Sequence, residues 1–127
     1  MTDKPHNSEK WTVARFHSFI KGGLRQISYR WPPKHEVKKA AWVKRGLYKC
    51  EGYKRKWHTA PTSILEKGKR VNNVFVDHIH PVIDPKKGWK SWDETIKRMF
   101  CEVEGLQVLC KECHKEKTND ERKQRST

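Results

Sequence analysis

The sequence predicts a small α+β protein with a basic helical extension before its core. Three observations support this fold class. Apolar residues recur at helical spacing between positions 16 and 27, short runs rich in β-branched and aliphatic residues occupy 74–76 and 106–109, and a polar helix-forming segment follows from 111 to about 123. We therefore expect a helical extension over residues 1–46 and an α+β core over residues 47–127.

The extension is expected to contain two helices. The first is predicted by one apolar stripe, formed by Phe16, Phe19, Ile20, Leu24 and Ile27. Trp31-Pro32-Pro33 should end it, because a residue that precedes proline is pushed out of the helical region. Pro33 can then lie in the first turn of a second helix that stops near Gly46.

The core is expected to alternate short strands with helices. Residues 47–50 indicate a short strand or turn, and residues 51–73 support no assignment. A strand is predicted at 74–76, closed by Pro81, and a second one at 106–109 after Gly105. Between them Ser91 and Glu94 form a capping box. It opens a helix whose apolar face comprises Trp92, Ile96, Met99 and Phe100.

Charge is the dominant feature of the composition. The net charge is +14, and residues 10–58 contain 14 Lys or Arg against two acids. A polyanion such as DNA should therefore meet this half first. Contacts of this kind bind phosphates without selecting bases. The expected DNA-binding residues are Lys21, Arg25, Arg30, Lys34, Lys38 and Lys39.

The composition also bounds the core and the compartment. Only 34% of the residues are apolar, so a large dry core is not expected and something else should help to hold the fold. The candidates are six Trp as bulky anchors, and four Cys and seven His as metal ligands. The sequence shows no apolar run of signal-peptide or membrane-span length, which predicts a cytoplasmic protein without a membrane partner. The four cysteines are then expected to be metal ligands or buried thiols instead of disulfides.

Two motifs carry the candidate chemistry. Asp77-His78, at the end of a predicted strand, combines a hard oxygen ligand with a titratable base. Cys110-x-x-Cys113 is a typical zinc-binding spacing in a reduced compartment. A helix that starts there would direct His114 away from the two cysteines, toward a different metal.

The order of these motifs resembles the HNH, or ββα-metal, endonuclease family, and most of all its small phage-encoded members. The resemblance covers residues 48–118 well and residues 11–46 more loosely. It implies a treble-clef-like ββα core and metal-dependent cleavage of double-stranded DNA, as a nick or a double break. It also implies a host-cytoplasmic location, with phage packaging proteins as further candidate partners. The sequence leaves the oligomeric state open.

The resemblance also implies residue roles. His78 is the general base, and Asp77 and His114 bind one divalent ion, Mg²⁺, Mn²⁺ or Ni²⁺, at the scissile phosphate. Gly105 stands where the family has the asparagine of its name, a residue that normally braces a loop. Zinc-bearing members have a second Cys-x-x-Cys, of which Cys50 is present while Tyr53 replaces its partner.

A closed zinc site needs a fourth ligand beside Cys50, Cys110 and Cys113. His58 is the preferred candidate, Cys101 is the other, and a chain without zinc is the third reading. An alternative function stays open as well. A zinc-stabilised nucleic-acid-binding module without catalysis explains the charge and the cysteines, but it does not explain Asp77, His78 and His114 in this order. An RNA-binding factor would explain only the charge.

Overall fold

The computed structural model describes residues 3–126 of the chain. It contains two compact units, Met1–Trp31 and Pro32–Thr127, and each is considered by itself. The second helix expected in the extension belongs to the second unit. The division between the two compact units therefore falls after residue 31, whereas the sequence placed it after residue 46. The protein is a small α+β structure with antiparallel strands, as the sequence predicts.

The first unit consists of helix α1 (Val13–Ser28) and the turn before it. Thr12 caps the helix by accepting a 3.1 Å hydrogen bond from the backbone N–H of Arg15. The Trp11 ring packs on Phe19, with 5.3 Å between the ring centroids. The predicted apolar stripe is only partly covered, because Phe19 remains 62% exposed.

The second unit begins with helix α2 (Pro32–Ala41) and a three-stranded antiparallel sheet in the order β1-β2-β3. The strands are β1 (Trp42–Lys44), β2 (Leu47–Cys50) and β3 (His58–Pro61). The prediction that the second helix continues to about Gly46 is wrong. Trp42 instead pairs with Tyr48 across a turn in which Gly46 has a φ of +80°, a conformation that favours glycine.

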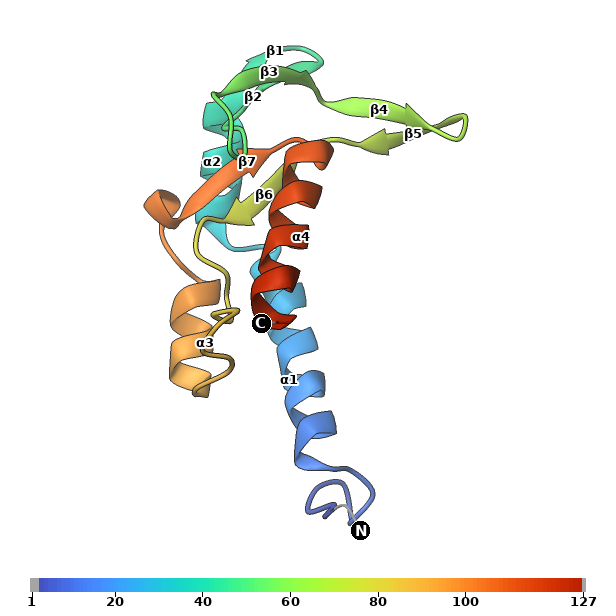
Figure 1. Cartoon of the computed structure of the whole chain (residues 1–127), viewed down its shortest axis with the longest axis vertical. Helices are drawn as coiled ribbons and strands as arrows, with labels where there is room; N and C mark the ends of the chain where they lie inside the picture. Colours follow the sequence, from blue (N-terminus) through green and yellow to red (C-terminus); the bar gives the residue numbers. More distant parts are fainter. Residues whose placement is uncertain (1–2, 127) are drawn as a thin grey trace. The chain divides into compact units, whose positions relative to one another are not determined.

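The segment that the sequence left unassigned folds into a β-ribbon. Strand β4 (Ser63–Glu66) pairs with β5 (Lys69–Asn72), and the two form a separate two-stranded sheet (Figure 1). The connecting residues Lys67 and Gly68 both have positive φ, at 51° and 79°. This is the backbone of the tight hairpin turn that matches the twist of antiparallel strands.

The remaining elements form a hairpin followed by a helix. Strand β6 (Phe75–His78) pairs antiparallel with β7 (Leu106–Leu109), and helix α4 (Lys111–Ser126) follows directly. Helix α3 (Trp92–Met99) and the short helix η1 (Val103–Gly105) lie between the two strands in the chain. Ser91 caps α3 by accepting a 3.2 Å hydrogen bond from the backbone of Glu94, as predicted.

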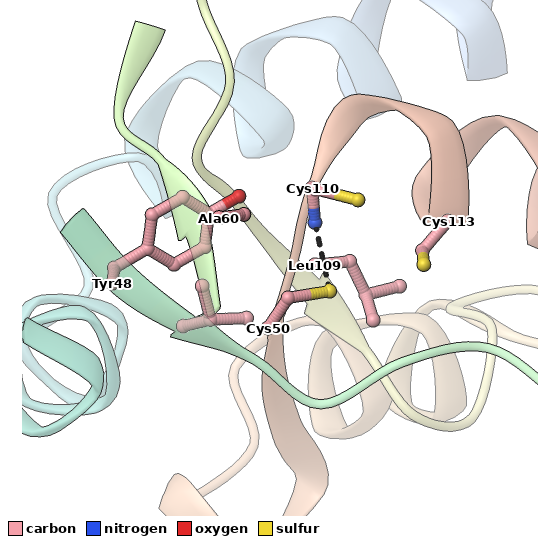
Figure 2. Close-up of a cluster of buried hydrophobic side chains, with 7 residues drawn as sticks. Tyr48, Cys50, Ala60, Leu109, Cys110 and Cys113 are labelled. Carbon is pink, nitrogen blue, oxygen red and sulfur yellow. Dashed lines mark hydrogen bonds between the residues drawn. The ribbon is translucent and has the colours of Figure 1, made fainter. Parts of the chain in front are cut away.

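The core is small and rich in cysteine. Its buried residues, shown in Figure 2 with all but one labelled, come from β2, β3, β7 and the start of α4. They are Tyr48, Cys50, Ala60, Val108, Leu109, Cys110 and Cys113. Helix α2 contributes Val37 and Ala41 to its edge. So few aliphatic side chains supply little hydrophobic stabilisation, in agreement with the composition.

Buried Asn73 joins three parts of the second unit. Its side-chain amide donates to the carbonyl of Pro61 at 2.8 Å, and its side-chain oxygen accepts from the backbone N–H of Lys111 at 2.9 Å. The second bond satisfies an N–H in the first turn of α4 that has no partner within the helix. The hydroxyl of Tyr48 donates a hydrogen bond to the backbone carbonyl of Asn73. One amide thus connects the base of the ribbon to the sheet and to the start of α4.

We expect Asn73→Ala to lower the free energy of unfolding by about 2 kcal/mol, because it removes the partner of the partly buried Pro61 carbonyl and of the Lys111 N–H. Urea denaturation measures this change. The matched control is Asn72→Ala, which removes an exposed amide that bonds only to Val74 nearby in the chain. Equal destabilisation by the two substitutions would contradict the role given to Asn73.

Candidate functional site

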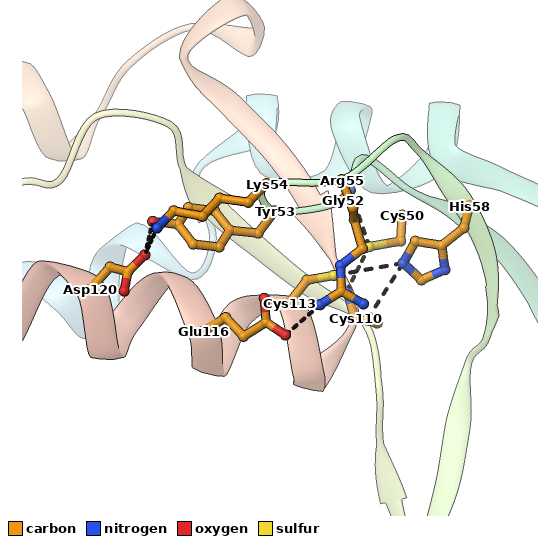
Figure 3. A network of polar contacts seen from close by, with 10 residues as sticks. All are labelled: Cys50, Gly52, Tyr53, Lys54, Arg55, His58, Cys110, Cys113, Glu116 and Asp120. Carbon is orange, nitrogen blue, oxygen red and sulfur yellow. Dashed lines mark hydrogen bonds and ion pairs between the residues drawn. The ribbon is translucent and has the colours of Figure 1, made fainter.

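Four potential metal ligands converge at the junction of β2, β3 and α4. Cys50 ends β2, His58 begins β3, Cys110 directly precedes α4, and Cys113 lies in the first turn of α4 (Figure 3). Their ligand atoms all lie within 4.8 Å of one another. The Nε2 atom of His58 lies 3.6 Å from the Sγ of Cys113 and 3.9 Å from the Sγ of Cys110.

This donor set fits zinc. Tetrahedral zinc with bonds of about 2.0 to 2.3 Å places neighbouring ligand atoms roughly 3.5 to 3.8 Å apart. The observed separations between His58 and the two thiols agree with that spacing. Four protein ligands close the coordination shell, and a closed shell is typical of structural zinc instead of catalytic zinc. The cluster can therefore hold a metal ion, and His58 takes the fourth position that the sequence left open.

Ionisation of the cysteine thiols in this cluster requires a bound cation. Burial raises the pKa of Cys50, although hydrogen bonds from the backbone N–H groups of Cys110 and Gly52 lower it in part. Burial also raises the pKa of Cys113 to about 12. Without a cation these groups stay protonated thiols. A bound metal would displace the protons, and the two N–H donors would then stabilise the thiolate of Cys50.

Tyr53 links the loop between β2 and β3 to helix α4. Its hydroxyl donates a 2.7 Å hydrogen bond to Asp120 on α4, and Lys54 pairs with the same carboxylate at 2.6 Å. Burial and this hydrogen bond raise the pKa of Tyr53 to about 12. Arg55 pairs with Glu116 one turn earlier (Figure 3). The loop between β2 and β3 is thus held against the helix by polar contacts.

Cys101 is not a member of this cluster. It lies beside Gly105, where an added Cβ atom would come within 2.9 Å of the Cys101 sulfur. This contact gives a local reason for glycine at position 105. The backbone carbonyl of Gly105 also accepts a 2.9 Å hydrogen bond from Ile79, which holds the end of β6.

A second group of polar side chains lies between β6 and α4. The Oδ1 atom of Asp77 is 3.7 Å from the Nε2 atom of His114. Its Oδ2 atom is 3.0 Å from the Nζ of Lys117 and 3.3 Å from the side-chain nitrogen of Gln107. The His114 ring stacks on Phe75, at a centroid distance of 5.1 Å. The carboxylate therefore has one oxygen held by two donors while the other faces the imidazole.

His78 lies on the other side of the strand. Its Nε2 atom is 2.8 Å from the carbonyl oxygen of Met99 at the end of α3. Neighbouring residues on a strand point to opposite faces, and β6 remains regular through His78. Burial lowers the pKa of His78 and favours its neutral form. The structure thus brings Asp77 and His114 together and holds the His78 ring against a different element.

Sequence reasoning missed Lys117. This side chain is only 9% exposed, and its ammonium group also donates a 3.0 Å hydrogen bond to the carbonyl of His78. Burial opposes its charge, but the carboxylates of Glu121 and Asp77 outweigh that effect and raise its pKa. The available signal was its position three residues after His114, because such residues share a helix face. A cleft of about 420 Å³ adjoins Lys117 and is also lined by Arg98 and Glu121.

The predicted DNA-binding residues lie on two helices or directly after one of them. Lys21 and Arg25 belong to α1, Arg30 follows it, and α2 carries Lys34, Lys38 and Lys39. Four of them are exposed, namely Arg25, Arg30, Lys38 and Lys39. Their contact with DNA stays a prediction. Among the described residues, none of the helices has the length and apolar character to span a membrane.

We expect the purified protein to contain about one zinc ion per chain and Cys113→Ala to lose it. The melting temperature of this variant should fall by more than about 10 °C, because the metal holds a fold with a small core. Elemental analysis and thermal unfolding measure the two quantities. Cys101→Ala is the matched control and should keep its zinc. A zinc-free wild type with unchanged melting in Cys113→Ala would reject the metal site.

Gly52 provides an independent test of the loop that carries this site. Its φ is +80°, and a Cβ atom there would lie 2.6 Å from the carbonyl oxygen of Lys56. Gly52→Ala should therefore destabilise the protein and weaken zinc retention against a chelator. Gly22→Ala, in α1 with open space around it, should leave zinc retention unchanged. Equal chelator resistance of Gly52→Ala and the wild type would show that the loop tolerates the change.

No protein-family model, curated protein or solved structure matches this chain in the comparisons made.

Proposed function

We propose that this protein is a metal-dependent DNA endonuclease of the HNH type. The observation that carries the proposal is the 3.7 Å separation between Asp77 Oδ1 and His114 Nε2. The two residues are 37 positions apart in the sequence and come from different elements. A carboxylate and an imidazole at this distance can share one divalent cation, since ligand atoms around Mg²⁺ or Mn²⁺ lie about 3 Å apart.

The neighbours of Asp77 support a ligand role for it. Lys117 and Gln107 both contact Oδ2, so the carboxylate is oriented with Oδ1 toward His114. Stacking on Phe75 fixes the plane of the His114 ring. Contacts that orient ligands in this way are characteristic of metal sites.

His78 is proposed as the general base. A carbonyl oxygen can only accept a hydrogen bond, so the contact with Met99 requires a proton on Nε2 of His78. In a neutral ring the Nδ1 atom then carries the lone pair and can take a proton from water. Because the ring and the Asp77 carboxylate leave β6 on different sides, the substrate phosphate would have to lie at the end of the strand, within reach of both.

The divalent ion would supply Lewis-acid stabilisation of charge on the phosphate and the leaving oxygen. The protein would supply its position and the cations around it. Arg98 lines the adjoining cleft and is suited to hold a neighbouring phosphate. The zinc cluster keeps a separate, structural role, because its four ligands are all protein side chains.

A zinc-stabilised DNA-binding module without catalysis is the second candidate. The Cys₃His cluster and the net charge of +14 favour it. It assigns no task to the pairing of Asp77 with His114.

Plasmid relaxation tests the proposal. The wild type with Mg²⁺, Mn²⁺ or Ni²⁺ should convert supercoiled plasmid to nicked or linear product. His78→Ala should lower the rate by about 10² to 10⁴, the usual contribution of a general base. His35→Ala, which removes an exposed histidine of α2, is the matched control and should retain the rate.

A second variant, Asp77→Asn, and a separate measurement of duplex binding complete the test. Asp77→Asn should abolish metal-dependent cleavage while zinc content and duplex binding persist. Undiminished cleavage by His78→Ala would reject the assigned base. A wild type that binds duplex DNA and fails to cut with any of the three ions would favour the binding module.

A further inference from the structure

The β4–β5 hairpin, residues 63–72, is a ribbon with no established task. We propose that this ribbon enters the major groove of double-stranded DNA and sets where along the duplex the protein acts. The inference rests on the proposed function only for the identity of the partner.

The ribbon is a separate two-stranded sheet, and its own strand pairing gives it little stability. Its two strands pair only with each other, and an isolated two-stranded hairpin is at best marginally stable in water. Figure 1 shows β4 and β5 extending beyond the end of β3. Leu65 is 65% exposed on it. An extended, poorly covered element of this kind costs stability, and contact with a partner would offset that cost.

The two faces of the ribbon differ. Ile64 pairs with Val71 and Glu66 with Lys69, so these four side chains share one face. The opposite face carries Leu65 and Arg70 in one pair and Ser63 and Asn72 in the other. On this second face Arg70 donates a 2.9 Å hydrogen bond to Ser63. An arginine and an apolar side chain are residue types that contact base edges.

The charge of the ribbon fits DNA. Its tip and returning strand carry Lys67, Lys69 and Arg70, all exposed. Its one acid, Glu66, is paired with Lys111 of α4. Three cations therefore remain to meet a polyanion, and their contacts with phosphates would release counterions.

The size of the ribbon also fits. Each strand has four residues and spans about 13 Å, and the strands lie about 5 Å apart. The major groove is about 12 Å wide and admits a two-stranded ribbon, whereas the minor groove, at about 6 Å, is too narrow.

The ribbon is firmly connected to the candidate active site. Asn73, directly after β5, is bonded to Pro61 and to the first turn of α4. Strand β6 follows at once and carries Asp77. A base-pair position sensed by the ribbon would therefore be fixed relative to the cut.

Dimethyl sulfate footprinting on a 16-bp duplex tests the inference, because this reagent methylates guanine N7 in the major groove and adenine N3 in the minor groove. The full-length protein is bound without added divalent ions, so that cleavage does not interfere. The wild type should protect guanine N7. The triple substitution Lys67→Gln, Lys69→Gln and Arg70→Gln should lose that protection and bind about tenfold more weakly. Its salt dependence, log K against log salt, should be shallower by about 2 to 3.

Two further variants separate shape from charge. Gly68→Val keeps every charge but places a β-branched residue at a φ of +79°, so it should lose guanine N7 protection as well. The charge-matched control Lys87→Gln, Lys90→Gln and Lys97→Gln removes three exposed cations elsewhere and should keep it. Zinc content verifies that each variant is folded.

Several outcomes would overturn the inference. They are wild-type protection by the triple ribbon variant, protection confined to adenine N3, and a wild type that does not bind duplex DNA. Cleavage is measured separately, so the two proposals can fail independently. Guanine N7 protection that the ribbon substitutions abolish, in a protein that does not cleave, would reject the nuclease and keep the groove contact. Cleavage by a protein whose guanine N7 protection survives the ribbon substitutions would keep the nuclease and reject the groove contact.

Discussion

The arrangement of the second unit depends on the convergence of Cys50, His58, Cys110 and Cys113. The four residues join β2 and β3 to the junction between β7 and α4, although Cys50 and Cys110 are 60 positions apart in the chain. The buried cluster around them contains only two aliphatic residues larger than alanine, Val108 and Leu109. Hydrophobic burial is therefore weak here, and a metal bound by these ligands would supply folding free energy directly.

The start of α4 is fixed from several directions. The backbone N–H of Cys110 donates to the sulfur of Cys50, and the next N–H, of Lys111, donates to Asn73. His114 follows within the same turn. The distance from His114 to Asp77 therefore depends on the metal cluster and on the side-chain amide of Asn73. These groups set the geometry of the candidate active site although they take no part in the proposed chemistry.

Helix α4 has almost no apolar residues, yet two of its faces are engaged. One row, Cys113, Glu116 and Asp120, meets the cluster and the loop between β2 and β3. The adjacent row, His114, Lys117 and Glu121, meets β6 and the cleft. The two rows have the same spacing and are offset by one residue, so they form neighbouring stripes on the helix. Metal ligation and ion pairs replace the apolar stripe by which a surface helix usually packs.

The sequence by itself determined the elements with a local signal. Periodicity located α1, helix-forming composition located α4, the β-branched and aliphatic runs located β6 and β7, and Ser91 with Glu94 located α3. The Cys-x-x-Cys spacing indicated a metal before any geometry was available. Each of these signals lies within a few residues, where backbone geometry dictates the pattern.

Only the tertiary structure decided what depends on residues distant in the chain. It placed His58 instead of Cys101 in the cluster, folded residues 63–72 into a ribbon, and ended α2 at Ala41 where Trp42 pairs with Tyr48. It also turned Asp77 toward α4 and His78 toward Met99, and it buried Lys117 between them. These choices follow from packing and hydrogen bonding between separate elements, which no local pattern of residues encodes.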